Sequence, residues 1–363
     1  MAYTDIDDPT AYFQTKIYTG DGNDNRSITF DGNSNLAVNF LWFKNRGATA
    51  WHNLYDSVRG ANKALASNAT NAEESRSDTL DSFNSNGFTV GNDTSQNPDG
   101  LNTNANGNTY VTWGWKAGTS FTNDASATGI GTIDSTGSVN TDAGFSIVSY
   151  TGNQTSGATV AHGLGSKPAM MIFKERNGTT GWVVYHHKNT SAPATEYLQL
   201  NSSNATGDYA GYFNDTEPTS SVFTLGNDTG INQSGDTYIA YCFAEKKGYS
   251  KFGSYTGNGS ASSGTFIYTG FKPAFVMIKR TDTTGSWEMF DAKREGFNPQ
   301  VHGLYANGSN AEDNTDDLLD LLSNGFKLYH DGGGLNASNG TYIYMAFAEN
   351  PFVTSTGVPA TAR

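Results

Sequence analysis

Apolar and polar residues follow patterns typical of β-strands over much of the chain. In TYIYMAF (341–347), alternate residues would point to opposite faces of a strand, and both sets include large apolar side chains. MMIF (170–173) and FVMI (275–278) are apolar at every position, which indicates strands that are covered on both faces. Only DDLLDLL (316–322) indicates helix, for a turn or two. The pattern therefore predicts many short strands and little helix.

An internal repeat runs through the chain, because five landmarks recur three times in the same order. They are a Tyr-Thr-Gly turn, an apolar strand that ends in lysine and is followed by tryptophan, an Asn-x-Ser/Thr-Asn-Ala segment, a turn leading into a short strand, and a closing strand. The landmarks begin at Tyr18, Tyr150 and Tyr255; at Leu36, Pro168 and Pro273 (strands that end in Lys44, Lys174 and Lys279 and are followed by Trp51, Trp182 and Trp287); at Asn68, Asn201 and Asn307; at Asn86, Ser221 and Asn324; and at Thr109, Thr237 and Thr341. Ordered matches at nearly constant spacing indicate one module used three times.

The repeat predicts three modules, at residues 1–118 (with an N-terminal segment), 144–248 and 249–351. Residues 119–143 are rich in Ser, Thr and Gly, which is typical of a connector, and residues 352–363 are expected to form a flexible C-terminal tail. Short strands at regular spacing, separated by Gly and Asn turns, predict an all-β protein. The expected architecture is three tandem antiparallel β-sandwich modules of the jelly-roll or lectin-like type.

Composition narrows the class of protein. The 21 Phe, 19 Tyr and 6 Trp supply enough apolar surface for a packed core, so the polar composition does not indicate disorder. The net charge of −13 argues against nucleic acid as a partner, since phosphate binding needs clustered Lys and Arg. No apolar run is long enough to insert into a membrane and no signal peptide is recognisable, so synthesis in the cytoplasm is expected. The single cysteine, Cys242, lies in an apolar segment and excludes an internal disulfide.

The repeated tryptophan and lysine positions are the candidate binding residues. The candidate glycan-binding set is Trp51, Trp182, Trp287, Lys44, Lys174 and Lys279. An exposed indole can stack on the apolar face of a sugar ring, while ammonium groups bind its hydroxyls. The alternative is that the tryptophans fill the core and the lysines cap strand ends. Recurrence favours this alternative, because every copy of a fold needs the same core. Binding specificity is then expected in the unrepeated loops 93–107 and 186–196.

Catalytic and metal-binding motifs are not recognisable in the sequence. There is no Gly-x-Ser-x-Gly elbow, P-loop, HExxH motif or Cys/His cluster. DGNDN (21–25) resembles the start of a calcium loop, but Arg26 and Gly32 stand where that loop needs glycine and glutamate. His186 and His187 are adjacent and would point to opposite faces of a strand. The sequence therefore predicts a non-enzymatic protein with no cofactor and no metal. The alternative is a glycan hydrolase whose two carboxylates come from distant strands, a pairing that spacing along the chain does not test.

Four segments resemble a widespread family of virion proteins. They are AYTDIDDPTAYFQTKIYTGDG (2–22), WHNLYDSVRGANKALASNATNAE (51–73), GFSIVSYTGNQTSGATVAHGLGSKPAMMIFKERN (144–177) and KGYSKFGSYTGNGSASSGTFIYTGFKPAFVMIKRTD (247–282). The family comprises structural proteins of tailed bacteriophages, especially marine ones that infect cyanobacteria, and its members are described as tail fibre-like or as having no defined function. The resemblance covers nearly the whole chain. It implies a lectin-like jelly-roll particle protein and carries over no active site.

The resemblance implies two functions. The first is a tail fibre- or spike-associated component that serves host attachment by binding host surface glycans. The alternative is a decoration or connecting protein of the capsid or tail, whose partners are other virion proteins. The chain lacks the heptads of a long coiled-coil stalk, which favours a compact part. In both cases a homo-oligomer located in the virion is expected, without nucleic acid or membrane insertion.

Overall fold

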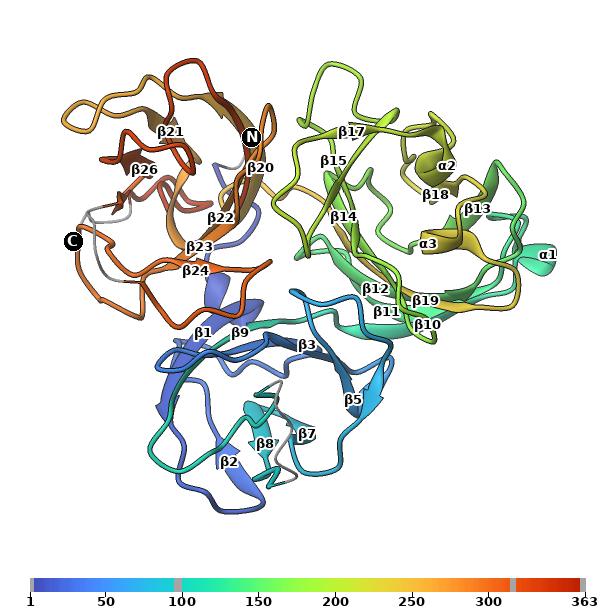
Figure 1. The fold of residues 1–363 in the computed structure, drawn as a ribbon, viewed down its shortest axis with the longest axis horizontal. Helices are drawn as coiled ribbons and strands as arrows, with labels where there is room; N and C mark the ends of the chain where they lie inside the picture. The colour runs from blue at the N-terminus through green and yellow to red at the C-terminus, as the bar shows by residue number, and fades with distance from the viewer. Residues whose placement is uncertain (1–2, 95–99, 314–317, 360–363) are drawn as a thin grey trace.

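The structure is a computed structural model that describes residues 3–94, 100–313 and 318–359. Its strands form six sheets, and the neighbouring strands within them run antiparallel. Each of three large sheets faces a smaller sheet of its own, and the three resulting units surround a common centre (Figure 1). The prediction of an all-β, sandwich-like fold is confirmed.

Unit 1 (residues 3–118) begins with a 3-10 turn, η1 (Pro9–Ala11), which Asp8 caps. Its large sheet has the order β1-β9-β3-β4-β5-β6 and its small sheet the order β2-β8-β7. The strands are β1 (Phe13–Thr19), β2 (Arg26–Ile28), β3 (Phe40–Asn45), β4 (Asn53–Asp56), β5 (Gly60–Leu65), β6 (Glu74–Ser75), β7 (Leu80–Asn84), β8 (Gly87–Val90) and β9 (Thr109–Trp115).

Unit 2 (residues 119–248) has the large sheet β10-β11-β12-β19-β14-β15-β16-β17 and the small sheet β13-β18. The strands are β10 (Thr119–Asn123), β11 (Ser135–Asn140), β12 (Phe145–Thr151), β13 (Ala158–Ala161), β14 (Met170–Glu175), β15 (Val183–His186), β16 (Glu196–Gln199), β17 (Gly207–Asp208), β18 (Val222–Leu225) and β19 (Thr237–Phe243). The helices are single turns: α1 (Ala125–Thr128), α2 (Ala210–Phe213) and α3 (Thr229–Asn232).

Unit 3 (residues 249–351) has the large sheet β20-β27-β22-β23-β24 and the small sheet β21-β26-β25. The strands are β20 (Ser250–Thr256), β21 (Phe266–Tyr268), β22 (Phe271–Arg280), β23 (Trp287–Asp291), β24 (Leu304–Tyr305), β25 (Leu319–Leu322), β26 (Gly325–Leu328) and β27 (Thr341–Pro351). Strand β25 corrects the helix expected over 316–322, of which 316 and 317 lie outside the described residues. Burying Leu319 and Leu321 against the large sheet requires the two-residue period of a strand, and this packing overrides the local pattern.

Corresponding positions in the three units make the same contacts. The tyrosine of each Tyr-Thr-Gly turn pairs and stacks with the tyrosine of the closing strand. These pairs are Tyr18 and Tyr110 with ring centroids 5.2 Å apart, Tyr150 and Tyr238 at 5.2 Å, and Tyr255 and Tyr342 at 4.9 Å. In each unit the first tyrosine also donates its hydroxyl to a backbone carbonyl about 80 residues further along, at 2.6 or 2.7 Å. The first and last landmarks of the repeat are therefore neighbours in space.

The central strands of each large sheet are buried on both faces, but against different partners. In β27, the alternation separates Ile343, Met345 and Phe347 from the two tyrosines between Thr341 and Met345. The first set joins a central cluster to which all three units contribute, and the tyrosines pack against the small sheet of unit 3. Aromatic contacts cross the centre: the ring centroids of Phe40 in unit 1 and Tyr241 in unit 2 are 4.4 Å apart. The units therefore share one core in addition to their own.

The segments outside the predicted modules are also structured. Residues 119–143, expected to be a connector, contain β10 and β11, which extend the large sheet of unit 2. In the predicted tail 352–363, the backbone N–H of Ser355 donates to Asp7 at 2.7 Å, which places the tail beside the N-terminal segment. Residues 360–363 lie outside the described part. No helix in the described ranges combines the length and apolar character needed to cross a membrane.

Candidate functional site

The repeated Asn-x-Ser/Thr-Asn-Ala loop of each unit docks onto another unit, and the three contacts close a ring. At the end of each loop a backbone N–H donates to the carbonyl of the residue two positions after the repeated lysine. These bonds are Glu73 to Arg176 (2.7 Å), Thr206 to Thr281 (3.0 Å) and Glu312 to Arg46 (2.8 Å). The loop of unit 1 thus bonds to unit 2, the loop of unit 2 to unit 3, and the loop of unit 3 to unit 1. We call these three contact regions the joints.

Trp182 and Trp287 are fully buried in two of the joints. The Trp182 indole N–H donates to the carbonyl of Ala66 in unit 1 at 2.8 Å. The Trp287 indole makes the corresponding bond to Gln199 in unit 2 at 2.9 Å. Because each indole is enclosed by the preceding unit, neither presents a face to a sugar ring.

In the third joint, His52 takes the position that tryptophan has in the other two. The backbone N–H of His52 donates to the side chain of Asn68, the first asparagine of the loop, at 2.9 Å. In units 2 and 3 the first asparagine of the loop accepts the same bond from the backbone N–H of Trp182 or Trp287. Trp42 donates to Nδ1 of His52 at 2.8 Å, and burial lowers the pKa of the ring well below its usual value. The sequence match of Trp51 to the other tryptophans is therefore shifted by one residue. Trp51 is only partly buried, so sugar contact by its indole stays a prediction.

The three repeated lysines are buried at the ends of their strands, and burial lowers the pKa of each to about 8. Lys44 donates to the carbonyl of Ser309 in unit 3 at 3.0 Å, and Lys279 donates to Ser203 in unit 2 at 3.4 Å. Lys174 donates to two carbonyls of its own turn. The structure therefore places the lysines, like Trp182 and Trp287, inside the protein and not on an open surface.

A second set of cross-unit bonds lies deeper in the joints. They are Tyr241 hydroxyl to Asp56 (2.7 Å), Trp113 indole to Asp291 (3.1 Å) and the His186 ring with the carbonyl of Tyr344 (3.2 Å). Both carboxylates also pair with a buried arginine three residues on, at 2.5 and 2.6 Å. In the joint between units 2 and 3, Met345 stands where units 1 and 2 have the donors Trp113 and Tyr241, and it has no such donor group. In the same joint His186 stands where the other two joints have an aspartate, and its ring bonds the backbone carbonyl of Tyr344. The joints thus keep the same role with different side chains.

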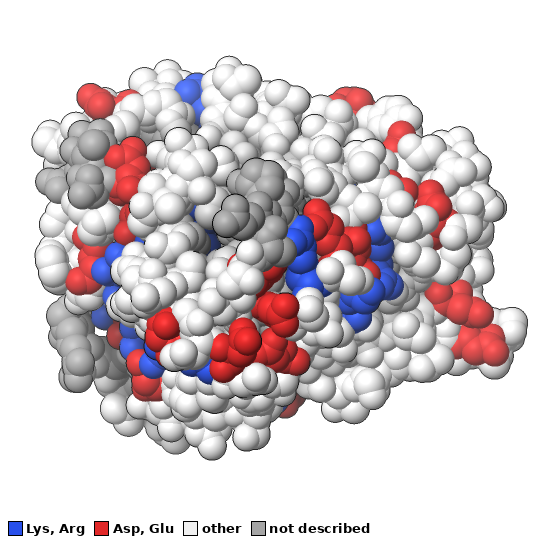
Figure 2. Space-filling view, turned by 60° about the horizontal axis from the view of Figure 1, so that its bottom comes forward, with Lys and Arg blue, Asp and Glu red and all other residues white. Residues whose placement is uncertain are grey.

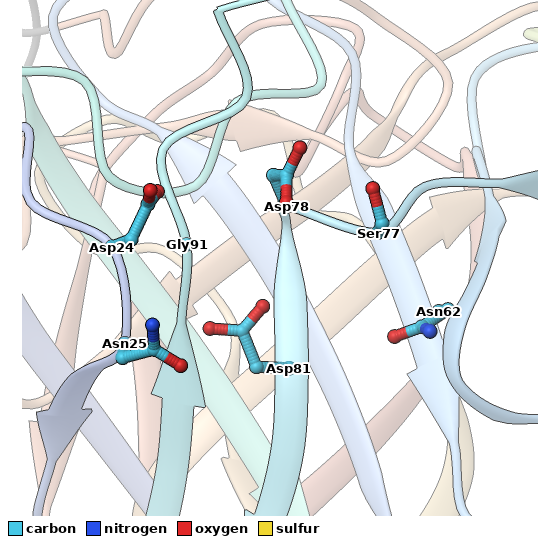
Figure 3. Close-up of a pocket in the computed structure, with 7 residues that line it drawn as sticks. All are labelled: Asp24, Asn25, Asn62, Ser77, Asp78, Asp81 and Gly91. Atoms are coloured by element: carbon cyan, nitrogen blue, oxygen red, sulfur yellow. The ribbon is translucent and has the colours of Figure 1, made fainter.

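A polar pocket of about 300 Å³ opens on unit 1 (Figure 3). Asp24 comes from the segment before β2, Asn62 from β5, and Asp78 and Asp81 from the turn before β7 and from β7 itself. Burial and the neighbouring charges of Asp78 and Asp24 raise the pKa of Asp81. The lining is acidic and lacks any aromatic side chain, which suits hydrogen bonding to a polar ligand but offers nothing on which a ring could stack.

The small sheet of unit 3 carries exposed aromatic side chains on its outer face. Phe266 and Tyr268 are 45% and 59% exposed and flank the buried Ile267, so both point away from the core. Phe266 lies opposite Lys327 on β26, whose ammonium is 4.9 Å from the Tyr329 ring centroid. We call this surface the outer face of unit 3. It combines apolar rings with hydrogen-bonding groups on a rigid sheet.

The same face differs in the other two units. In unit 1, Ile28 corresponds to Ile267, because Ile28 pairs with Phe88 on the neighbouring strand as Ile267 pairs with Phe326. The residues that flank Ile28 are Ser27 and Thr29, which are polar. In unit 2, residues 131–133 lie along the free edge of β13, and the N–H of Thr132 donates to the carbonyl of Thr159 at 2.8 Å. Exposed rings on this face are therefore a property of unit 3, and the corresponding edge of β21 pairs with no other described strand.

The unrepeated loops that were expected to carry specificity are partly structural. Within 93–107, residues 95–99 lie outside the described part, and Asn104 is buried and donates to Asp21 at 2.9 Å. Within 186–196, the first residue lies in a joint, and the His187 ring bonds the carbonyl of Phe252 at 2.8 Å.

Charge on one face of the molecule and metal-ligand geometry among the described residues were the remaining indications of a site. On the face shown in Figure 2, acidic and basic side chains lie together in mixed clusters and form no broad basic patch. Among the described residues, no group of three or more His, Cys, Asp or Glu side chains is arranged to hold a metal ion. Asp21, in the segment that resembles a calcium loop, lies 3.4 Å from Arg26 and accepts from Asn104 instead.

The fold and the joints define a class of protein: a ring of three β-sandwich units with a shared centre. Residues 8–351 match one family, described as Domain of unknown function (DUF7483), and the chain belongs to that family. The match extends across all three units, as expected if the ring is the inherited domain. No curated protein and no solved structure matches the chain.

Proposed function

We propose that this protein is a non-enzymatic structural component of a bacteriophage virion, associated with the tail, that binds host surface glycans through the outer face of unit 3. The virion assignment rests on the resemblance of four long segments to phage particle proteins. The closed ring supports a mechanical role, because its joints fix the units in one arrangement.

The observation that carries the glycan proposal is the pair of rings on β21. Phe266 and Tyr268 point outward from one strand, so a sugar could lie across both rings. Lys327 opposite Phe266 supplies a hydrogen-bond donor, and Asp320 opposite Lys327 supplies acceptors. A shallow site of this kind binds weakly, and many copies on one particle would raise the overall affinity.

The test is glycan-array and host-cell binding by the purified protein and by a Phe266→Ala/Tyr268→Ala variant. We expect the variant to keep its fold, because both side chains are exposed, and to lose at least tenfold in binding. The matched control is Ser27→Ala/Thr29→Ala, which changes the corresponding face of unit 1 and should bind as the parent does. Binding that survives in the Phe266/Tyr268 variant would remove the outer face of unit 3 from the proposal.

A second candidate function is a decoration or connecting protein that binds other virion proteins. The open edge of β21 favours it, because in unit 2 the corresponding edge of β13 is covered by residues 131–133. An open edge can accept a strand from another protein. A virion reconstruction separates the two: density at the tail tip supports attachment, while density on the capsid lattice with a partner strand along β21 supports decoration.

A further inference from the structure

Unit 3 contains a cavity of about 100 Å³ between β23 and the segment that precedes β27. Its lining combines two acidic residues, a histidine and a tyrosine with glycine and aliphatic residues: Glu288, Asp313, His330, Tyr305, Gly334, Val301, Leu318 and Leu335. Tyr305 lies opposite Glu288 on the neighbouring strand. Polar and apolar lining surfaces are therefore found together in a space that holds a group of a few heavy atoms.

Glu288 lies in this cavity without a hydrogen-bond partner among the described residues. Its side chain belongs to a residue that is only 8% exposed. Gly334 makes room for the carboxyl group, because a β-carbon there would lie 1.8 Å from a carboxyl oxygen of Glu288. Burial, together with the charge of Asp313, raises the pKa of Glu288 to about 8. A buried carboxyl with no protein partner is unfavourable, so a bound hydrogen-bond donor would stabilise it.

The fold itself does not require a carboxyl at this position. The corresponding residue, directly after the buried tryptophan or histidine of the joint, is Val183 in unit 2 and Asn53 in unit 1. Val183 packs in the apolar core of unit 2, and the Asn53 amide donates to the carbonyl of Leu101 at 3.0 Å. Val183 needs no hydrogen-bond partner, and the amide nitrogen of Asn53 has one within its own unit. The Asn53 amide oxygen and the Glu288 carboxyl have no hydrogen-bond partner among the described residues, and only the carboxyl lines the cavity of unit 3.

We infer that this cavity binds a small primary ammonium group, such as the end of an alkylamine or an amino-bearing side chain. The Glu288 carboxyl supplies an acceptor for the ammonium, Asp313 adds negative charge at the cavity, and the aliphatic residues contact the attached carbon chain. The described residues show no metal-ligand geometry, which favours an organic cation over a metal ion. The net charge of −13 also attracts cations to the protein. This site is separate from the outer face of unit 3 and does not depend on the proposed glycan binding.

Binding would be coupled to proton release. In the free protein the raised pKa keeps Glu288 protonated at neutral pH. An ammonium ion in the cavity favours the ionised carboxylate, so the carboxyl proton leaves to solvent as the cation binds. Affinity should therefore rise about tenfold for each pH unit up to about pH 8 and then level off.

The experiment is isothermal titration of the full chain with ethylammonium chloride at pH 6, 7 and 8, in two buffers of different ionisation enthalpy. We expect saturable binding with one proton released at pH 6 and 7. Glu288→Gln should lose at least tenfold in affinity and release no proton. Asp320→Asn, which removes a carboxylate from the outer face of unit 3, should bind as the parent does.

Three outcomes would overturn the inference: no saturable heat beyond that of sodium chloride, equal binding by the parent and Glu288→Gln, or equal competition by sodium or potassium. If Glu288→Gln fails to fold, Glu288→Asp withdraws the carboxyl by one methylene and should weaken binding while retaining its pH dependence. The Phe266→Ala/Tyr268→Ala variant should keep ethylammonium binding, so the two proposals fail independently.

Discussion

The joints and the outer halves of the units are built from the same repeat, yet they have diverged to different degrees. In the joints, the loop, the lysine and the enclosed ring recur in all three units or are replaced by a side chain with the same role, as His52 replaces tryptophan. On the outer side, corresponding positions differ in chemistry: Asn53, Val183 and Glu288 are an amide, an aliphatic and an acid. Recurrence therefore marks the parts that close the ring, and divergence marks the places where we propose that ligands bind.

The largest effect that tests this comparison is expected in a joint. Trp182→Ala would remove a fully buried indole and its bond to Ala66, at a cost of about 3–5 kcal/mol in the free energy of unfolding. Chemical denaturation measures it. Trp51→Ala is the matched control: it changes the tryptophan that the sequence aligns with Trp182 but that is only partly buried, and it should cost less than half as much. Equal losses would contradict the assignment of His52 to the joint position.

The second effect concerns the outer half of unit 3 and depends on pH. The folded protein binds the Glu288 proton more tightly than the unfolded chain does between about pH 4.5 and pH 8. Stability should therefore fall as the pH rises through that window, by about 1.4 kcal/mol per pH unit from this residue alone. Glu288→Gln should remove this contribution, so the difference in stability between variant and parent should grow with pH up to about pH 8 and then stay constant.

Val183→Gln is the control for the pH experiment, because it places the same amide at the corresponding position of unit 2. It should destabilise the protein by an amount that does not change with pH. A parallel pH profile for the parent and Glu288→Gln would contradict the buried, protonated carboxyl.

The smallest of these effects tests the substitution of partners between joints. Tyr241→Phe removes one bond to the buried Asp56 carboxylate, which keeps its pair with Arg59 at 2.5 Å, so we expect a loss of about 1.5–3 kcal/mol. Met345→Leu, at the corresponding position of unit 3, should cost less than about 1.5 kcal/mol because no side-chain bond depends on it. Denaturation midpoints of the two variants measure the difference, and a larger loss for Met345→Leu would show that the joints do not share one plan.

Much of the fold could be predicted from the sequence, because the repeat and the strand period are local signals. The alternation in 341–347 separated the two faces of β27 correctly. It could not show that Met345 and Phe347 pack against other units, since periodicity says that a face is apolar and not what covers it. The same limit affected Trp182 and Trp287: an indole at a strand end is compatible with a sugar site or a joint until the neighbouring unit is placed.

The outer face of unit 3 and the cavity at Glu288 were not predicted from the sequence, for a related reason. Phe266 and Tyr268 appear in the sequence as two more aromatic residues in a strand, and their exposure follows only once Ile267 is known to face the core. Glu288 has no recurring partner in the sequence, because Asp313 reaches the cavity from a distant loop. A comparison of the three repeats position by position would have singled out Glu288, since Val183 and Asn53 are uncharged.

The shared centre has a consequence for how the chain is made. Unit 1 leaves the ribosome with Trp113 and Trp115 on a sheet face whose partners are Asp291 and Phe275, in a unit that is synthesised last. During translation that face stays uncovered until unit 3 emerges. Nascent and prematurely terminated chains should therefore need a chaperone or aggregate, and the finished ring should appear in one late step rather than unit by unit.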